Sequence, residues 1–115
     1  NIKSSDQNQS GFNWSGTYEG LLPCENCIGI KTKLFLYPDF TYTLQETYFD
    51  RTSYDRVYRG TFKFTNQSQN ILVLDQHAQQ RQFFVGDQFI EARASDGSEI
   101  TSVLKPHYKL DKVLY

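Results

Sequence analysis

Two cysteines are the residues of this 115-residue chain with the most reactive side chains. Cys24 and Cys27 are its only cysteines, and two residues separate them. Thiols at this spacing can close a disulfide, or bind one soft ion such as copper(I) as thiolates. A disulfide between them closes a very short loop and adds only about 2 kcal/mol in the chain-entropy treatment. The spacing leaves three interpretations open: a locally stiffening disulfide, a redox- or metal-responsive pair, and an inert reduced pair.

Other chemistries fit this pair poorly. Thioredoxin-type catalysis needs the first cysteine at a helix N-terminus, whereas the flanks here resemble strands and Glu25 would oppose thiolate formation. A structural zinc site needs four ligands. His77 and His107 stand alone far downstream; His77 is a candidate accessory metal ligand, although a solvated loop is the simpler interpretation for both. The sequence shows no Ser/His/Asp arrangement and no phosphate-binding glycine loop, so we predict no enzymatic activity.

The composition favours one all-β domain. Aromatic residues make up 16% of the chain, and such side chains suit a pleated, half-buried surface. Lys plus Arg is 12 and Asp plus Glu is 13, so the chain lacks the basic field that nucleic-acid binding requires. No apolar run approaches the roughly 20 residues that span a bilayer. Residues 1–11 are polar apart from one apolar residue and show no period, which predicts a flexible tether at 1–12 before a domain at 13–115.

Short runs separated by turn residues predict eight or nine strands. We expect these strands at 17–22, 30–37, 40–48, 56–64, 71–74, 82–85, 89–92, 100–104 and near 108–110. Gly86-Asp87 and Asp96-Gly97 are typical of tight hairpins. Because no helix is expected to cover a sheet face, we predict that the strands close into a small antiparallel barrel of about eight strands.

The faces of the predicted strands identify the interior. Alternation in 40–48 places Glu46 on the inward face, where a carboxylate must be paired or neutralised. Arg56, Arg59 and Arg81 are its candidate partners; in the alternative interpretation, Glu46 points outward at a barrel rim. The interior of an eight-stranded barrel either just fills or holds one small ligand, and the bulky rings favour filling. If a cavity exists, its candidate lining residues are Trp14, Tyr42, Tyr58 and Phe62; otherwise Trp14 closes one barrel end.

Two segments carry a specific pattern, residues 14–20 (WSGTYEG) and residues 22–32 (LPCENCIGIKT). Weaker matches follow at Asp39 with 41–44, at 60–62, at 96–100 and at 108–110. Together these segments resemble the N-terminal domain of the NlpE family of copper-homeostasis lipoproteins. The similarity extends over about residues 13–110. Phe40 departs from the family, which usually has glycine after this Pro-Asp pair, so we expect a different turn there.

The resemblance implies a lipocalin-like barrel at the periplasmic face of the outer membrane of Gram-negative bacteria. It implies a lipid anchor on a cysteine upstream of Asn1 and roles in copper tolerance and in signalling surface or envelope stress. Partners would be envelope signalling or lipoprotein-handling proteins. The family's cysteine motif makes Cys24 and Cys27 the candidate metal or redox site, with copper the only candidate cofactor. The second domain of longer relatives is absent from this sequence, which puts functions located there in doubt.

These observations favour a binding or sensing role over catalysis. In the leading hypothesis, oxidation or copper occupancy of the cysteine pair sets the order of residues 23–29 and thereby the surface shown to a partner. The first alternative is a lipocalin-like carrier of a small apolar ligand, which requires a continuous cavity of several hundred Å³. The second is a passive structural domain of the envelope.

Overall fold

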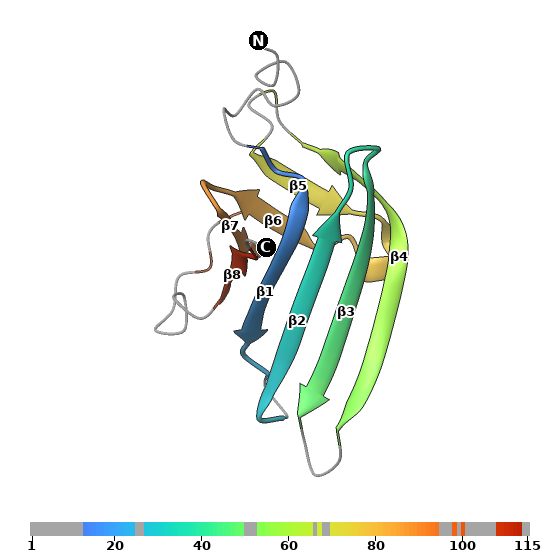
Figure 1. Cartoon of the computed structure of the whole chain (residues 1–115), viewed down its shortest axis with the longest axis vertical. Coiled ribbons are helices and arrows are strands. Elements are labelled where there is room, and N and C mark those ends of the chain that lie inside the picture. Colours follow the sequence, from blue (N-terminus) through green and yellow to red (C-terminus); the bar gives the residue numbers. More distant parts are fainter. Residues whose placement is uncertain are drawn as a thin grey trace.

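A computed structural model describes residues 13–24, 27–49, 53–65, 67, 70–94, 98, 100 and 108–113. Its strands form one closed antiparallel barrel in which each strand pairs with its neighbours in sequence and the last returns to the first (Figure 1). The strands are β1 (Gly16–Leu22), β2 (Gly29–Leu36), β3 (Thr41–Phe49), β4 (Tyr54–Phe64), β5 (Ile71–Leu74), β6 (Gln82–Val85), β7 (Phe89–Ala92) and β8 (Lys109–Lys112). One 3-10 turn, η2 (Gln76–Ala78), lies between β5 and β6.

This architecture confirms the predicted all-β barrel of about eight strands. β5, β6 and β7 have the predicted bounds, and β1 to β4 differ from them by one or two residues at their ends. The predicted tether at 1–12, the turn at 96–97, His107 and almost all of the predicted strand 100–104 lie outside the described residues. No helix in the described part of the chain has the length and apolar character needed to cross a membrane.

The two halves of the barrel differ in length. β1 to β4 contain 7, 8, 9 and 11 residues, and β5 to β8 contain four each. β4 pairs with β5 only through Phe62–Phe64, and β1 pairs with β8 only at Tyr18 and Glu19. The lower parts of β1 to β4 therefore project beyond the short strands (Figure 1).

The core fills the space between the two halves. Its innermost side chains are 0–2% exposed: Tyr18, Leu34, Leu36, Tyr42, Leu44, Leu72, Leu74, Phe83, Val85, Ile90 and Leu110. They come from every strand except β4. Alternate residues of a strand point to the same side of the sheet, so every second side chain of these strands can lie inside the barrel. Burial of these side chains is the main stabilising contribution that the barrel offers.

Trp14 packs at one end of this core. Its side chain is 5% exposed, and its ring lies 5.3 Å from the rings of Phe40 and Phe62. Phe40 adopts a φ of +67°, in the region that favours glycine. The aromatic side chain at this position packs against Trp14, and this contact offsets part of the backbone strain.

Candidate functional site

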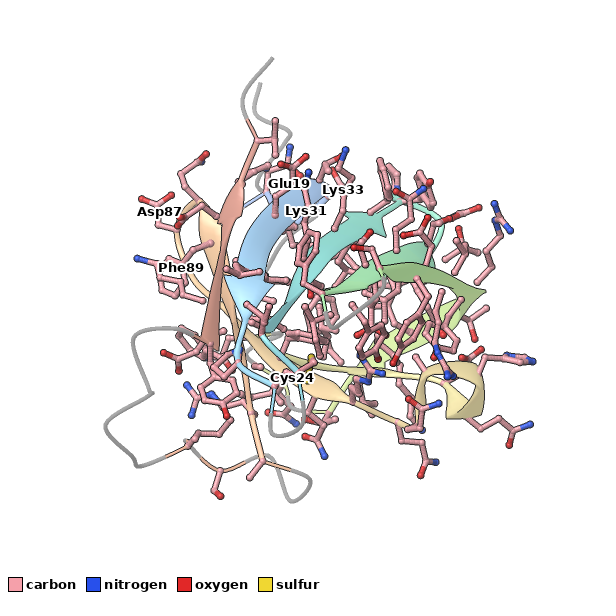
Figure 2. All side chains as sticks on the ribbon, turned by 90° about the horizontal axis from the view of Figure 1, so that it is seen from below. Glu19, Cys24, Lys31, Lys33, Asp87 and Phe89 are labelled. Atoms are coloured by element: carbon pink, nitrogen blue, oxygen red, sulfur yellow. A yellow bond between two sulfur atoms is a disulfide. The ribbon has the colours of Figure 1, made fainter. Side chains whose placement is uncertain are left out.

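The two cysteines form a disulfide at the lower end of the barrel. Cys24 and Cys27 are bonded, with their Cα atoms 5.3 Å apart, in the connection from β1 to β2. Cys24 is labelled in the view from below (Figure 2). The backbone N–H of Ile28 donates to the carbonyl of Phe49 at 2.7 Å, which ties the end of the connection to β3. The disulfide thus lies between two paired strands.

The two cysteine residues of the disulfide are not fully buried. Both cysteines are half-buried, whereas an inert pair would be enclosed in apolar packing. The neighbouring side chains of Leu21 and Ile28 are 58% and 82% exposed. Among the described residues, no group of three or more His, Cys, Asp or Glu side chains could hold a metal ion. Two thiolates alone, formed after reduction, fit the low coordination number of copper(I) better than that of zinc.

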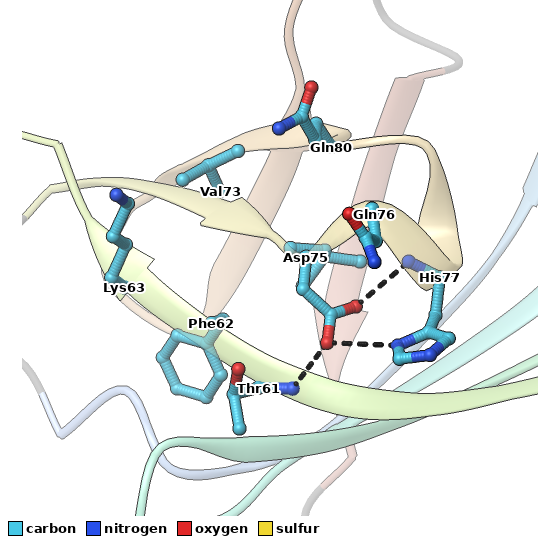
Figure 3. Close-up of a pocket in the computed structure, with 9 residues that line it drawn as sticks. Thr61, Phe62, Lys63, Val73, Asp75, Gln76, His77 and Gln80 are labelled. Carbon is cyan, nitrogen blue, oxygen red and sulfur yellow. Dashed lines mark hydrogen bonds and ion pairs between the residues drawn. The ribbon is translucent and has the colours of Figure 1, made fainter.

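His77 belongs to a different cluster, built around Asp75 (Figure 3). Asp75 follows β5 and caps η2, accepting from the backbone N–H of His77 at 3.1 Å. Its carboxylate also lies 3.1 Å from His77 Nδ1, and it accepts from the Tyr42 hydroxyl at 2.6 Å and from the Thr61 backbone N–H at 2.9 Å. Within the described residues, His77 therefore lies beside Asp75 and shares no metal-binding group with the two cysteines.

These contacts set the charge of Asp75. Desolvation acts to raise the pKa of its carboxyl, but the hydrogen bonds from Tyr42, Thr61 and His77 outweigh it and lower the pKa from 3.8 to about 2. A carboxylate that accepts several N–H and O–H bonds is held in its charged form. Gly60 makes this arrangement possible, because a Cβ there would overlap the Asp75 carboxylate. Nothing in the sequence pattern of 75–80 beyond a turn signal indicated this cluster.

Glu46 has the charged partner that its predicted burial required. It is 2% exposed, and its carboxylate accepts from Arg81 at 2.6 Å and from the Tyr48 hydroxyl at 2.9 Å. Of the three candidate arginines, Arg81 is thus the partner. Arg56 instead lies over the rings of Tyr48 and Tyr54. The pair connects β3 with the residue that directly precedes β6.

The four candidate ligand-lining residues lie in different surroundings. Trp14, Tyr42 and Phe62 are 1–5% exposed within the packed core, and Tyr58 lies beneath the Arg81 guanidinium. A hollow of about 210 Å³ is lined by residues that include Leu22 and Arg81, and another of about 370 Å³ borders the Asp75 cluster. Both are bounded partly by polar side chains and open to solvent, and Phe62 lines the second. The carrier hypothesis, which requires a continuous cavity of several hundred Å³, stays an alternative prediction.

Comparison with known proteins identifies the family. The NlpE N-terminal domain family matches residues 18–103. The chain belongs to the NlpE N-terminal domain family. A structure from Shewanella oneidensis assigned as a lipoprotein is similar at 30% identity and a TM-score of 0.83, covering 90% of this chain and 93% of that one. In a search of curated proteins, no sequence matches.

A second solved structure is that of the Cpx pathway activator NlpE from Escherichia coli, with 28% identity and a TM-score of 0.64. The alignment covers 78% of this chain and 47% of that one, so the present sequence spans about half the length of E. coli NlpE. NlpE is a family of envelope lipoproteins. The chain is accordingly an envelope lipoprotein domain, as the resemblance implied.

Proposed function

We propose that this NlpE domain senses thiol oxidation state or copper(I) through Cys24 and Cys27 and passes the signal to an envelope signalling partner. The observation that carries the proposal is the half-buried disulfide between β1 and β2. Such a short bridge adds little to stability, about 2 kcal/mol, so rigidity alone is a weak reason for it. The activity named for E. coli NlpE, activation of the Cpx pathway, supports a signalling partner.

The chemical step is a two-electron reduction by a cellular dithiol. The dithiol attacks one sulfur, the S–S bond breaks, and two electrons and two protons convert the disulfide into two thiols while the reductant becomes a disulfide. Copper(I) then displaces both thiol protons and binds the two thiolates. Either form, reduced or copper-bound, lacks the S–S bond between the end of β1 and the start of β2.

The readout is the apolar surface beside the pair. Leu21 packs against Gly29, where an added Cβ would lie 3.0 Å from its side chain, and Ile28 is 82% exposed. Leu21 precedes Cys24 by three residues, and Ile28 directly follows Cys27. Once the disulfide is broken, the bond from the Ile28 N–H to Phe49 is no longer supported by the S–S link and should open more often, so we expect Leu21 and Ile28 to change position relative to each other. A partner that contacts both side chains can distinguish the states.

Anaerobic titration of the reduced domain with copper(I), against a chromophoric copper(I) chelator, tests the proposal. We expect one copper(I) per chain and at least about a tenfold loss of affinity in the Cys24→Ser/Cys27→Ser variant, because both thiolate ligands are gone. His77→Ala is the matched control and should bind as the wild type does. Equal binding by the double variant would show that copper does not act through this pair.

A second measurement tests the redox branch. Amide hydrogen exchange at Leu21 and Ile28 should increase on reduction of the wild type and stay constant in Cys24→Ser/Cys27→Ser under the same reductant. If reduction leaves these amides unchanged, the disulfide does not control this surface, and a passive structural role becomes the better interpretation.

A further inference from the structure

Among the described residues, the lower part of β4 has a free edge. β4 pairs with β3 from Thr41↔Thr61 to Tyr48↔Tyr54, but β5 begins to pair with it only at Phe62. In Figure 1 the lower part of β4 lies at the outer side of the sheet, with no labelled strand beyond it. Residues 54–57 and 59 are exposed. Such an edge presents unpaired backbone groups to solvent and is a template for another strand.

The hydrogen-bond register identifies which groups are free. In an antiparallel pair, successive residues point their backbone groups alternately toward one neighbour and the other. Phe62 bonds to Phe40 on the β3 side, and Thr61 bonds on the opposite side to Asp75, whose backbone and carboxylate occupy both Thr61 groups. Below this cap the outward residues are 55, 57 and 59. No described residue bonds to the outward N–H and C=O groups of these three positions.

Two charged side chains on this edge also lack partners. Asp55 and Arg59 are exposed, and neither forms an ion pair or side-chain hydrogen bond within the described part of the chain. Four residues apart on one strand, they are separated by roughly 13 Å, which is too far for them to pair with each other. Between them lies Val57, 48% exposed on the same face of the sheet.

We propose that this edge pairs with the same edge of a second copy, antiparallel and with the two-fold axis at Val57. In this register Asp55 of each copy lies opposite Arg59 of the other, and Val57 lies opposite Val57. All three outward residues of each strand then exchange backbone hydrogen bonds, and two ion pairs flank an apolar centre. Opposite charges placed directly across a strand pair are stabilising.

The charges also exclude competing arrangements. A parallel pairing would put Asp55 against Asp55 and Arg59 against Arg59, and like charges directly opposite are destabilising. Antiparallel pairings with the two-fold axis at residue 55 or 59 place Asp55 opposite Asp55, or Arg59 opposite Arg59, and are destabilised for the same reason. A register shifted toward the C-terminal end of β4 would need Thr61, whose outward groups Asp75 already occupies. A register shifted toward the N-terminal end of β4 leaves Asp55 and Arg59 opposite uncharged residues. The symmetric register at Val57 pairs the outward backbone groups of residues 55, 57 and 59 and both charged side chains. Because the matching groups are those of the same edge, the expected partner is a second copy of this chain.

Sedimentation velocity of the oxidised domain, from about 10 μM to about 1 mM, tests the proposal in the range where weak dimers dissociate. We expect a concentration-dependent dimer. Asp55→Arg and Arg59→Asp should each weaken it about tenfold or more, because each places like charges opposite one another. Lys63→Glu is the matched control, since Lys63 is exposed on the same strand but pairs with Val73 of β5.

The decisive arm mixes the two single variants. One then carries an all-basic edge and the other an all-acidic edge, so the mixture should recover the dimer that each alone has lost, as should the Asp55→Arg/Arg59→Asp double variant. Recovery also excludes misfolding as the cause of the losses. A wild type that stays monomeric overturns the proposal and leaves the edge to a strand of another protein. A dimer indifferent to these charges overturns it as well. The Cys24→Ser/Cys27→Ser variant should dimerise normally, which separates this test from that of the sensing function.

Discussion

Replacing Asp75 by asparagine should remove a pH-dependent part of the domain's stability. The carboxylate accepts hydrogen bonds from the Tyr42 hydroxyl and from the backbone N–H groups of Thr61 and His77. An asparagine side chain has nearly the same shape, but it is uncharged and its NH₂ group cannot accept from these donors. The lowering of the Asp75 pKa from 3.8 to about 2 corresponds to roughly 2 kcal/mol. Because the side chain is 24% exposed, we expect a loss of about 1–2 kcal/mol.

The sign of the pH dependence follows from the lowered pKa. The folded protein holds Asp75 charged more strongly than the unfolded chain does, so its contribution is complete above the unfolded value of 3.8 and is lost as pH falls toward 2. The stability of the wild type should therefore exceed that of Asp75→Asn by about 1–2 kcal/mol at pH 6, and this difference should fall below about 0.5 kcal/mol near pH 2.

Urea unfolding followed by the fluorescence of Trp14, the one tryptophan, measures this difference between pH 2 and pH 7. Asp111→Asn is the control, because Asp111 is exposed on β8 and its replacement should change stability by less than about 0.5 kcal/mol. A double-mutant cycle with Tyr42→Phe should give a coupling of about 1.5 kcal/mol or more for the 2.6 Å bond to Asp75. A wild type and an Asp75→Asn variant that differ by a constant amount from pH 6 to pH 2 would refute the assignment.

Three further sets of substitutions test other parts of the structure. Gly60→Ala should cost about 1–3 kcal/mol in urea unfolding, because its Cβ would overlap the Asp75 carboxylate; a neutral result would mean that Asp75 moves freely. Trp14→Ala should cost about 3–5 kcal/mol by thermal or urea unfolding, since the ring is 5% exposed, and a loss below about 1 kcal/mol would contradict its packing role. Arg81→Ala should destabilise by about 3 kcal/mol, more than Glu46→Gln, because it leaves a carboxylate that is 2% exposed without its cation, whereas the Arg81 side chain is 30% exposed and can be hydrated; the reverse order in urea unfolding would contradict the described pair.

The strand-level features could be predicted because they are local. Alternation along 40–48 put Tyr42, Leu44 and Glu46 on the inward face, and all three are buried in β3. The burial of Glu46 in turn predicted a charged partner, but three arginines were equivalent in sequence. Only closure of the barrel brings Arg81, 35 residues away, to Glu46 while Arg56 lies over tyrosine rings instead.

The Asp75 cluster could not be predicted for a related reason. Its carboxylate bonds to Tyr42, 33 residues earlier, and to Thr61, 14 residues earlier. No period or motif records contacts at such separations, and the local pattern predicts only a turn. The spacing of Cys24 and Cys27 did predict that the two sulfurs could meet, because so short a loop needs no tertiary structure to bring them together.

The all-β class, the positions of most strands and the cysteine pair follow from the amino-acid sequence alone, since side-chain alternation and turn residues act over a few neighbouring positions. Only the folded barrel decides which donor each carboxylate binds. It also decides at which residue the pairing of β4 with β5 ends. Both depend on how long strands pair with short ones around a closed sheet, and that register is set by the packing of residues far apart in the chain.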